Sequence, residues 1–407
     1  MIGEEQFLAR INCLQQSMSA QGIAGFLVTQ HVGLYYLTGS MQAGYAFIPA
    51  AGEAVFYVRR SVERVQAESA VRVQPLQSLR ELGKLLEQDY PKLFPAGNNN
   101  GAEIKLVTEM DVLPAITYMK LAEILTGGGK TAVTLGDGSA LLRRLRMIKS
   151  AYEIERIEAA AAAVAESLEE AVAELHVGMS ELAFMAKIEY GIRLRGHIGI
   201  MRTRGYNMEI MTGMVGAGAA AAEPSAFDGP AGGRGLGPAA PQSVSRREIG
   251  RNEPILIDIG CCIDGYVIDQ TRTAVIGELT PKLAAAYEHS LSIIRETERQ
   301  MRPGTACDAL YASALGQAEQ AGLADHFMGY GANRVKFLGH GIGLEVDEWP
   351  VLAGGFHDVL EPGMVLAVEP KFTFPGEGVV GIENSYLITN QGARQLTKSP
   401  EGLIIVP

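Results

Sequence analysis

The chain has 407 residues, a length that predicts two or three domains. Its composition, with 47% apolar and 20% charged residues, is that of a globular protein, and the lack of a run of 18 uncharged apolar residues argues against a membrane span. The net charge of −11 comes without a basic stripe, which argues against nucleic acid as the main partner.

The first part of the chain alternates helical and strand patterns, which predicts an α/β layer structure. It opens with MIGEEQFLARIN, which has an early acidic pair and no apolar h-region, so we expect no secretory signal. Apolar residues at helical spacing predict a helix over 5–20, and GFLVTQ predicts a buried strand at 25–30. Further strands are predicted at 34–39 (LYYLTG), 54–60 and 131–138, and further helices at 61–71 and 109–125, the last ended by the triple glycine 127–129.

A long helical stretch marks the start of the second part of the chain. It covers residues 141–175, with a break near Lys149-Ser150. We place the domain boundary just before this stretch, which predicts one domain over 1–138 and another over 139–407.

The second part also holds a weak internal repeat. A long helix, a glycine turn and a second helix occur twice, with Gly178 and Ser180 in the first copy and Gly304 and Thr305 in the second. The hydroxyl of Ser180 or Thr305 could cap the helix that follows. The pattern predicts a duplicated αβ unit.

Between the two copies lies a stretch rich in Gly, Ala and Pro, residues 212–242. Glycine and proline are too dense there for regular structure. So long a segment inside a compact domain is either functional or mobile. We expect a loop over a site, with an inert surface loop as the alternative.

Two aspartates in an apolar strand pair give the first chemical signal. Residues 255–277 read ILIDIGCCIDGYVIDQTRTAVIG, with a hairpin turn signal at Asp264-Gly265. Asp258 and Asp269 are expected opposite one another on one face, with Cβ atoms about 4.5–5.5 Å apart. Carboxylates that close repel unless they are neutralised, for which a shared metal would serve. The alternative is a solvent-facing hairpin with ordinary aspartates.

A second hairpin adds two glutamates, and a glycine-rich segment adds a histidine. Residues 365–389 turn at PGEG, which brings Glu369 across from Glu383. His340 stands in LGHGIGLE, where the flanking glycines would keep side chains from crowding a metal; the alternative is a turn that contains a histidine. Four carboxylates and one imidazole suit two divalent ions, of Mn, Co, Zn or Fe, bridged by carboxylates and a water.

The four cysteines, at positions 13, 261, 262 and 307, form neither a zinc-binding pattern nor a disulfide framework. We expect the adjacent residues Cys261 and Cys262 to be small apolar side chains buried in the core. Reduced thiols predict a cytoplasmic protein.

Taken in order, the motifs resemble the pita-bread metallopeptidases, which include methionine aminopeptidase, aminopeptidase P, prolidase and the non-peptidase creatinase. The resemblance rests on IDIG, DQTRT, GHGIGLE, VEP and IEN, on the lead-in RMIKSAYEIERI, and on LYYLTG in the first half. It covers nearly the whole chain. It implies a creatinase-type α/β domain over 1–138 and, over 139–407, an α+β pita-bread catalytic domain with pseudo-two-fold symmetry and a curved antiparallel sheet.

The same resemblance implies roles for particular residues and an assembly. Glu369 would be a catalytic proton shuttle as well as a ligand, and the relatives suggest a homodimer. The metal ligands carried over by position are Asp258, Asp269, His340, Glu369 and Glu383.

The sequence departs from the family at the positions that contact substrate. Asp347 stands where the peptidases have a histidine that contacts the substrate carbonyl, and a carboxylate cannot donate a hydrogen bond there unless it is protonated. Ser225, after Pro224, is the nearest counterpart of a second family histidine. Gly381 replaces a frequent arginine, and Asn384 replaces an aspartate.

Nearby polar residues are candidates to complete the substrate site. Arg204 and Tyr206 lie in MRTRGYNME, just before the glycine-rich stretch, and a plain polar strand or turn is the alternative. Asp347 could anchor a cationic group or act as a general base, and the alternative is an ordinary surface acid.

Three functions follow as hypotheses. The first is a metal-dependent hydrolase acting on dipeptides or Xaa-Pro bonds. The second is another reaction on the same fold, a lyase or a small-molecule amide or amidine hydrolase with a cationic substrate. The third is a non-catalytic binding protein. A small peptide or small molecule is the expected ligand in the first two, and no membrane partner is expected.

Overall fold

The computed structural model describes residues 3–94, 103–126 and 132–407. They form two compact units, Met1–Leu145 and Arg146–Pro407, so the helix at 139–145 belongs to the first unit, whereas the sequence pattern assigns it to the second. The predicted helix stop at 127–129 lies outside the described residues. Within the described ranges, no helix has the length and apolar character needed to cross a membrane.

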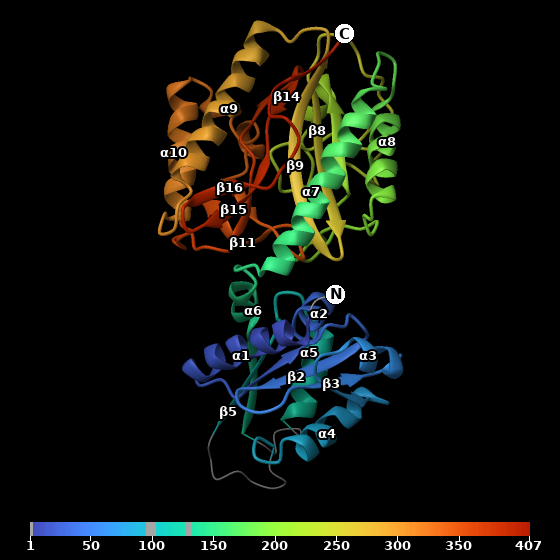
Figure 1. Ribbon diagram of the computed structural model, residues 1–407, viewed down its shortest axis with the longest axis vertical. Coiled ribbons are helices and arrows are strands. Elements are labelled where there is room, and N and C mark those ends of the chain that lie inside the picture. Colours follow the sequence, from blue (N-terminus) through green and yellow to red (C-terminus); the bar gives the residue numbers. More distant parts are fainter. Residues whose placement is uncertain (1–2, 95–102, 127–131) are drawn as a thin grey trace. The chain divides into compact units, whose positions relative to one another are not determined.

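The first unit is a mixed sheet with helices, as the alternating pattern predicts (Figure 1). The strand order is β4-β3-β2-β1-β5-β6, and its apolar core includes Leu27, Phe47 and Leu106. The elements are α1 (Glu4–Ala20), β1 (Gly25–Val28), α2 (His31–Thr38), β2 (Gly44–Pro49), β3 (Val55–Val58), α3 (Val62–Glu68), β4 (Arg72–Pro75), η1 (Leu79–Glu81), α4 (Leu82–Asp89), β5 (Ile104–Thr108), α5 (Ala115–Leu125), β6 (Val133–Asp137) and α6 (Ser139–Leu145).

The predicted strand at 34–39 is wrong, because these residues lie in helix α2 and its C-cap. The Gln30 side chain accepts a hydrogen bond from the Gly33 N–H, and Gly39 ends the helix at φ 90°, in the left-handed region that favours glycine. Most of α2 is buried, so no polar face reveals a helical period. The sequence also misses strand β2, which takes the place of the predicted strand beside β1.

The predicted helix over 109–125 begins later than expected. Helix α5 starts at Ala115, directly after Pro114, whose backbone is not helical. A proline biases the residue before it away from the helical conformation, which makes it a frequent helix boundary.

The second unit combines four long helices with three antiparallel or mainly antiparallel sheets. Its elements are α7 (Ala151–Val172), α8 (Glu181–Leu194), β7 (Gly213–Ala217), η2 (Gly218–Ala222), β8 (Ile255–Ile263), β9 (Tyr266–Ile276), α9 (Pro281–Gln300), α10 (Cys307–Gln320), η3 (Ala324–His326), η4 (Gly331–Asn333), β10 (Phe337–Gly341), β11 (Glu348–Ala353), β12 (Val365–Val368), β13 (Lys371–Phe374), β14 (Gly378–Gly381), β15 (Asn384–Thr389), β16 (Gly392–Gln395) and β17 (Ile404–Val406).

Local signals explain where the helices begin. Ser150 and Glu153 form a capping box at the start of α7, which accounts for the predicted break at this point. Ser180 caps α8 by accepting a hydrogen bond from the Ala183 N–H. The prediction that Thr305 caps the next helix is wrong. Helix α10 begins after Ala306, and the Thr305 hydroxyl donates a hydrogen bond to the Gln300 carbonyl instead.

The two halves of this unit carry helices on their outer sides (Figure 1). Helix α7 contacts β8 and β9, and α8 contacts β7. In the other half, α9 contacts β13, β14 and β16, and α10 contacts β10 and β11. Gly178 and Gly304, which precede α8 and α10, have φ of 87° and 88°, so the repeated glycine turn has the same backbone conformation in both halves.

The strands form a four-stranded sheet β17-β9-β8-β7, a five-stranded sheet β11-β10-β12-β15-β16 and the pair β13-β14. The two hairpins therefore do not lie in one continuous ladder. A bridge between Thr271 and Glu383 joins them, with a hydrogen bond in each direction. This junction brings the aspartate hairpin to the glutamate hairpin.

The stretch 212–242 contains more regular structure than its composition suggests. Residues 213–217 form strand β7, which pairs with β8 from Gly213 opposite Ile259 to Ala217 opposite Ile255. A Cβ on Gly213 would lie 2.1 Å from the Asp258 carbonyl oxygen, so a glycine is required for the strand to fit here. The remainder, 223–242, is mostly loop.

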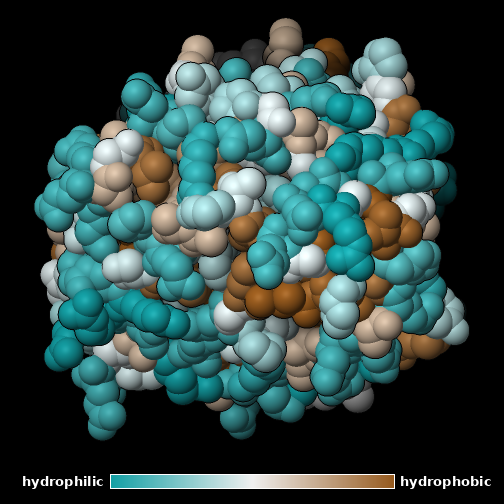
Figure 2. Space-filling view, turned by 90° about the horizontal axis from the view of Figure 1, so that it is seen from above, coloured by the Kyte–Doolittle hydropathy of each residue, from teal (hydrophilic) through white to brown (hydrophobic). Residues whose placement is uncertain are grey.

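Hydrophilic residues cover most of the face seen from above, and apolar residues gather in a limited area near its centre (Figure 2).

Candidate metal centre

The aspartate hairpin is shaped by a two-residue turn. Asp264 and Gly265 have φ of 50° and 94°, as in turns that match the twist of paired strands. The turn pairs Asp258 with Thr271 and Asp269 with Gly260, so the two aspartates are diagonal and not directly opposite as predicted. The offset of two residues keeps both on the same face, because side chains in a strand alternate with period two.

Strand β10 presents His340 between two glycines. A Cβ on Gly339 would lie 2.1 Å from the Ala367 carbonyl oxygen, and one on Gly341 would lie 2.3 Å from the Trp349 carbonyl oxygen. The glycines therefore admit the backbones of neighbouring strands β12 and β11, whereas the sequence suggests that they keep space clear for a metal. His340 is buried, and its Nδ1 lies 3.1 Å from the Gly341 carbonyl oxygen.

The glutamates lie at the ends of their strands. Glu369 follows β12 and Glu383 precedes β15, and the register on either side puts them across from one another, as predicted. The Thr271 hydroxyl donates to Glu383 Oε2 at 2.8 Å. Glu383 is thus held by both side chain and backbone to the aspartate hairpin.

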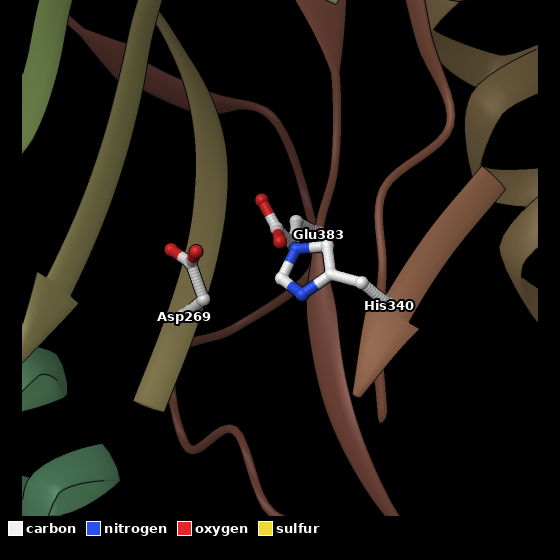
Figure 3. A group of neighbouring side chains, drawn as sticks. All are labelled: Asp269, His340 and Glu383. Atoms are coloured by element: carbon white, nitrogen blue, oxygen red, sulfur yellow. The ribbon is translucent and has the colours of Figure 1, made fainter. Parts of the chain in front are cut away.

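Three of these side chains form a group able to hold a metal ion. One ligand atom from each of Asp269, His340 and Glu383 lies within 4.8 Å of the others, and the three converge from separate segments (Figure 3). A mixed oxygen and nitrogen donor set of this kind fits a divalent ion such as Mn²⁺, Co²⁺, Zn²⁺ or Fe²⁺. Glu369 is adjacent, with its Oε1 3.8 Å from His340 Nε2.

A lysine that the sequence does not single out lies among the carboxylates. Lys371 Nζ is 2.6 Å from Glu369 Oε2, 3.0 Å from Glu383 Oε2 and 3.1 Å from Asp258 Oδ2. Only 1% of its side chain is exposed. The available signal was its position two residues after Glu369 in a β-rich run, which puts both side chains on one face.

The burial of so many acids perturbs their ionisation. Burial, together with the charges of Glu383 and Asp258, raises the pKa of Asp269 well above its ordinary value. Burial also raises the pKa of Glu369 to about 7, although Lys371 opposes the shift. For Glu383 the ammonium of Lys371 and His340 outweigh burial and lower the pKa. A site with this much negative charge favours cations.

The imidazole and the lysine respond to the same charges. Burial acts to lower the pKa of His340, but Asp347, Glu369 and Glu383 outweigh it and raise that pKa overall. Burial also opposes the charged form of Lys371, and the three carboxylates outweigh it and hold the pKa well above the ordinary value. Lys371 is therefore an ammonium throughout the physiological range.

Asp347 lines the same cavity as the five predicted ligands. Its side chain is 42% exposed, and its Oδ1 lies 3.6 Å from His340 Nδ1. Its backbone has φ of 62°, a left-handed conformation that aspartate tolerates better than most residues. The segment after the histidine strand thus carries residue 347 along the cavity wall.

A buried ionic cluster holds the segment on both sides of Asp347. Arg146 pairs with Glu345 and Glu348, and Lys149 Nζ lies 3.2 Å from Glu348 Oε2. Burial favours the neutral form of Glu348, but Arg146 and Lys149 outweigh it and lower its pKa to about 2. In the sequence, Arg146 and Lys149 contribute only to the family resemblance through RMIKS, and no local pattern there singles them out from the neighbouring charged residues.

The predicted substrate-binding residues do not meet at the cavity. The Arg204 side chain is 5% exposed, with its Nη1 3.9 Å from Glu345 Oε2, and Tyr206 is 90% exposed. Ser225 lies in the loop, where its hydroxyl accepts a hydrogen bond from the Phe227 N–H. None of the three lines the cavity that holds the acids. Their predicted role stays a prediction.

Apolar residues and loop backbone form much of the remaining lining. The stretch 212–242 contributes at its two ends and from residues 227 to 232, so it does lie at the site, as expected. The apolar side chains on the cavity include Met201, Met211, Met214, Phe227, Phe337 and Val346.

Comparisons with known proteins agree with this geometry. The model of "Metallopeptidase family M24" matches residues 155–390, and that of "Creatinase/Prolidase N-terminal domain" matches residues 10–148. The Xaa-Pro dipeptidase of Pyrococcus horikoshii is 26% identical over 97% of this chain and 98% of its own length.

Two solved structures illustrate the likeness in fold. An Xaa-Pro dipeptidase from Bacillus anthracis superposes with a TM-score of 0.81 at 26% identity, covering 98% of this chain and 100% of that one. The dipeptidase PepE from Mycobacterium ulcerans gives a TM-score of 0.80 at 26% identity, covering 100% of this chain and 99% of that one.

Proposed function

The chain belongs to metallopeptidase family M24 and is a hydrolase, and from this premise we propose that it cleaves Xaa-Pro dipeptides with a bound divalent metal ion. The proposal rests on one observation. Asp269, His340 and Glu383 converge on a single cavity, and Glu369 lines the same cavity beside them. The proteins of similar sequence and fold that are named Xaa-Pro dipeptidases support this substrate class.

A divalent ion in this group would supply a Lewis acid that polarises the scissile carbonyl and makes water more acidic. Glu369 is the proposed proton shuttle. Its carboxylate can take a proton from water and pass it to the leaving nitrogen. Its Oε2 accepts a hydrogen bond from Lys371, which fixes the orientation of the carboxyl group.

The apolar lining suits the rest of a small peptide. Phe227, Phe337 and the methionines offer surface to an apolar side chain and to a proline ring. Asp347, part of the same lining, offers an anion to the charged amino group of a dipeptide.

A second candidate function rests on Asp347 alone. A carboxylate in place of a hydrogen-bond donor disfavours a developing oxyanion and favours a cationic small molecule. We therefore keep an amide or amidine hydrolase, or a lyase, acting on such a molecule as the alternative. A panel of guanidino and quaternary-ammonium compounds, assayed beside the dipeptides, separates the two functions.

The direct test uses the purified full chain, stripped with a chelator and reloaded separately with Mn²⁺, Co²⁺, Zn²⁺ or Fe²⁺. We expect at least one metal to restore hydrolysis of Ala-Pro and Met-Pro, measured as free proline by chromatography, with Ala-Ala cleaved more slowly. No proline release with any of the four metals would overturn the proposed substrate class.

The number of ions and the assembly are proposals as well. The five predicted ligands suggest two ions, whereas Lys371 lies among three of their carboxylates. The homodimer and the cytoplasmic location stay predictions, which light scattering at micromolar concentration and cell fractionation test.

A further inference from the structure

We propose that the ammonium of Lys371 takes the place of one of two divalent cations, so that the chain binds a single divalent ion at Asp269, His340 and Glu383. The proposal rests on the proposed function only in requiring that a metal is bound. It concerns the count of ions and the role of one lysine, and it holds whichever substrate the enzyme cleaves.

The hydrogen bonds of Lys371 support this assignment. An ammonium has three N–H donors, and three carboxylate oxygens lie within 2.6–3.1 Å of Nζ, one from each of Asp258, Glu369 and Glu383. With the side chain 1% exposed, these acids satisfy the whole ammonium. Asp258 and Glu369, two of the five predicted ligands, are thereby engaged by the lysine, and neither belongs to the three-residue metal group.

The fold makes room for this lysine at one position. Lys371 pairs with Gly381 across β13 and β14. A Cβ on residue 381 would lie 2.6 Å from Lys371 Cγ and 2.7 Å from its Cα, closer than real contacts allow. The bare glycine opposite therefore lets the aliphatic chain of Lys371 run towards the acids. The backbone is fixed too, since the Lys371 carbonyl accepts a hydrogen bond from the Met328 N–H.

Charge favours one ion over two. Four carboxylates and one ammonium surround the centre. One divalent ion leaves the cluster with a single net negative charge, which the cationic amino group of a substrate can offset. A second ion would have to share oxygens with a fixed ammonium at about 3 Å, where two like charges in a buried site repel strongly. Lys371 thus offsets one of the two negative charges of Asp258 and Glu369 without a metal.

The experiment counts metal in the folded protein and needs no activity. The full chain is stripped, loaded with excess Mn²⁺, passed over a desalting column, and analysed for manganese per chain by mass spectrometry. Electron paramagnetic resonance of the frozen sample separates isolated Mn²⁺ from coupled pairs. We expect one manganese per chain and an isolated-ion spectrum. Two per chain with a coupled spectrum, or none, would overturn the proposal.

Substitutions then test whether Lys371 sets the count. In Lys371→Ala, which removes both the charge and the volume, we expect a second manganese and a coupled spectrum. Lys282→Ala is the matched control, because that lysine pairs with Glu377 at the surface, 2.5 Å away, and should leave the count at one. A folded Lys371→Ala protein that still holds one isolated ion contradicts the proposal.

Two further results keep the outcomes separate. If Lys371→Ala does not fold, judged by circular dichroism, the count in the unchanged chain still decides for or against the proposal. A chain that holds one ion and does not cleave Xaa-Pro dipeptides would overturn the proposed function and leave the role of Lys371 standing.

Discussion

The cavity has two kinds of wall, and they differ in how the chain builds them. One wall, named the ligand wall after the five predicted ligands, consists of Asp258, Asp269, His340, Glu369 and Glu383, which stand on paired strands or directly at their ends. The loop wall consists of the lining residues between 201 and 243, where only the β7 part pairs in a ladder. On paired strands a period of two fixes which residues share a face, whereas a loop has no such period. The two walls should therefore respond differently to substitution.

Loss of a ligand should give the largest effect. In Glu383→Ala the three-residue group loses a carboxylate that the strand junction holds in place. We expect loss of bound metal, and a fall in kcat/KM on the order of 10³-fold, about 4 kcal/mol of transition-state stabilisation. Metal analysis and dipeptide kinetics measure the two effects.

Glu377→Ala is the control for that variant. Glu377 lies exposed in the turn of the same hairpin and pairs with Lys282. Its removal should leave both metal and rate unchanged. Full metal content in Glu383→Ala would mean that the ligand wall does not hold the ion through this residue.

The ionic cluster that supports Asp347 should give the next largest effect, on stability. Arg146→Ala removes the 2.6 Å ion pair of Glu345 and one of the two cations that pair with Glu348, whose other cation is Lys149. Breaking a buried pair from one side costs about 3–5 kcal/mol. Urea unfolding measures it. Arg394→Ala removes a half-exposed pair with Glu158 and should cost under about 1 kcal/mol. Equal losses in the free energy of unfolding in the two variants would contradict a stabilising role for the ionic cluster.

The same cluster predicts the behaviour of the fold in acid. The pKa of Glu348 is lowered from 4.5 to about 2 in the folded chain. Its stabilisation is therefore complete above pH 4.5 and is lost as the pH falls through 2, because the unfolded chain binds the proton more readily. Glu348→Gln should unfold with a smaller pH dependence between these limits, measured by circular dichroism. An unchanged acid transition would count against the ion pair.

The part of the site that stands on strands can be predicted from the sequence, and the errors in that prediction have local causes. The spacing of Asp258 and Asp269 gave the correct face, but a two-residue turn shifted their register by two. Helix α2 was mistaken for a strand because burial on nearly all sides removes the periodic signal. Lys371 was missed although its position implied its face, since the sequence does not show that Gly381 stands opposite.

The loop-borne part could not be predicted in the same way. None of the three predicted substrate-binding residues, Arg204, Tyr206 and Ser225, lines the cavity. The course of a loop depends on tertiary contacts, and no periodic pattern of residues in the sequence reveals them. Asp347 is the exception among non-strand residues. It follows His340 closely, and buried acids on both sides of it restrict its path.

Asp347 lies between the two walls, and substituting it tests whether its side chain contacts the substrate. Asn tolerates the left-handed backbone at φ 62°, so Asp347→Asn should keep its fold and melting temperature. If the carboxylate binds a cationic substrate group, kcat/KM should fall about ten- to a hundredfold, since a hydrogen bond to a charged group contributes about 1.5–3 kcal/mol. Asp347→His exchanges this anion for a hydrogen-bond donor, so it should raise cleavage of Xaa-Pro dipeptides if the residue faces the scissile carbonyl and lower it if the residue binds the amino group. Kinetics unchanged in both variants would remove Asp347 from the site.

The smallest expected effects on KM should distinguish residues of the loop wall from neighbouring loop residues that do not line the cavity. Phe227 lines the cavity, and Phe227→Ala should raise KM about fivefold, because losing part of an apolar contact costs on the order of 1 kcal/mol. Tyr206 is 90% exposed and does not line the cavity, so Tyr206→Ala should leave KM within about twofold. Dipeptide kinetics on the pair measure the difference, with circular dichroism to show that both fold. A larger loss in Tyr206→Ala than in Phe227→Ala would mean that the loop changes course when substrate binds, and that the predicted substrate role of Tyr206 is right.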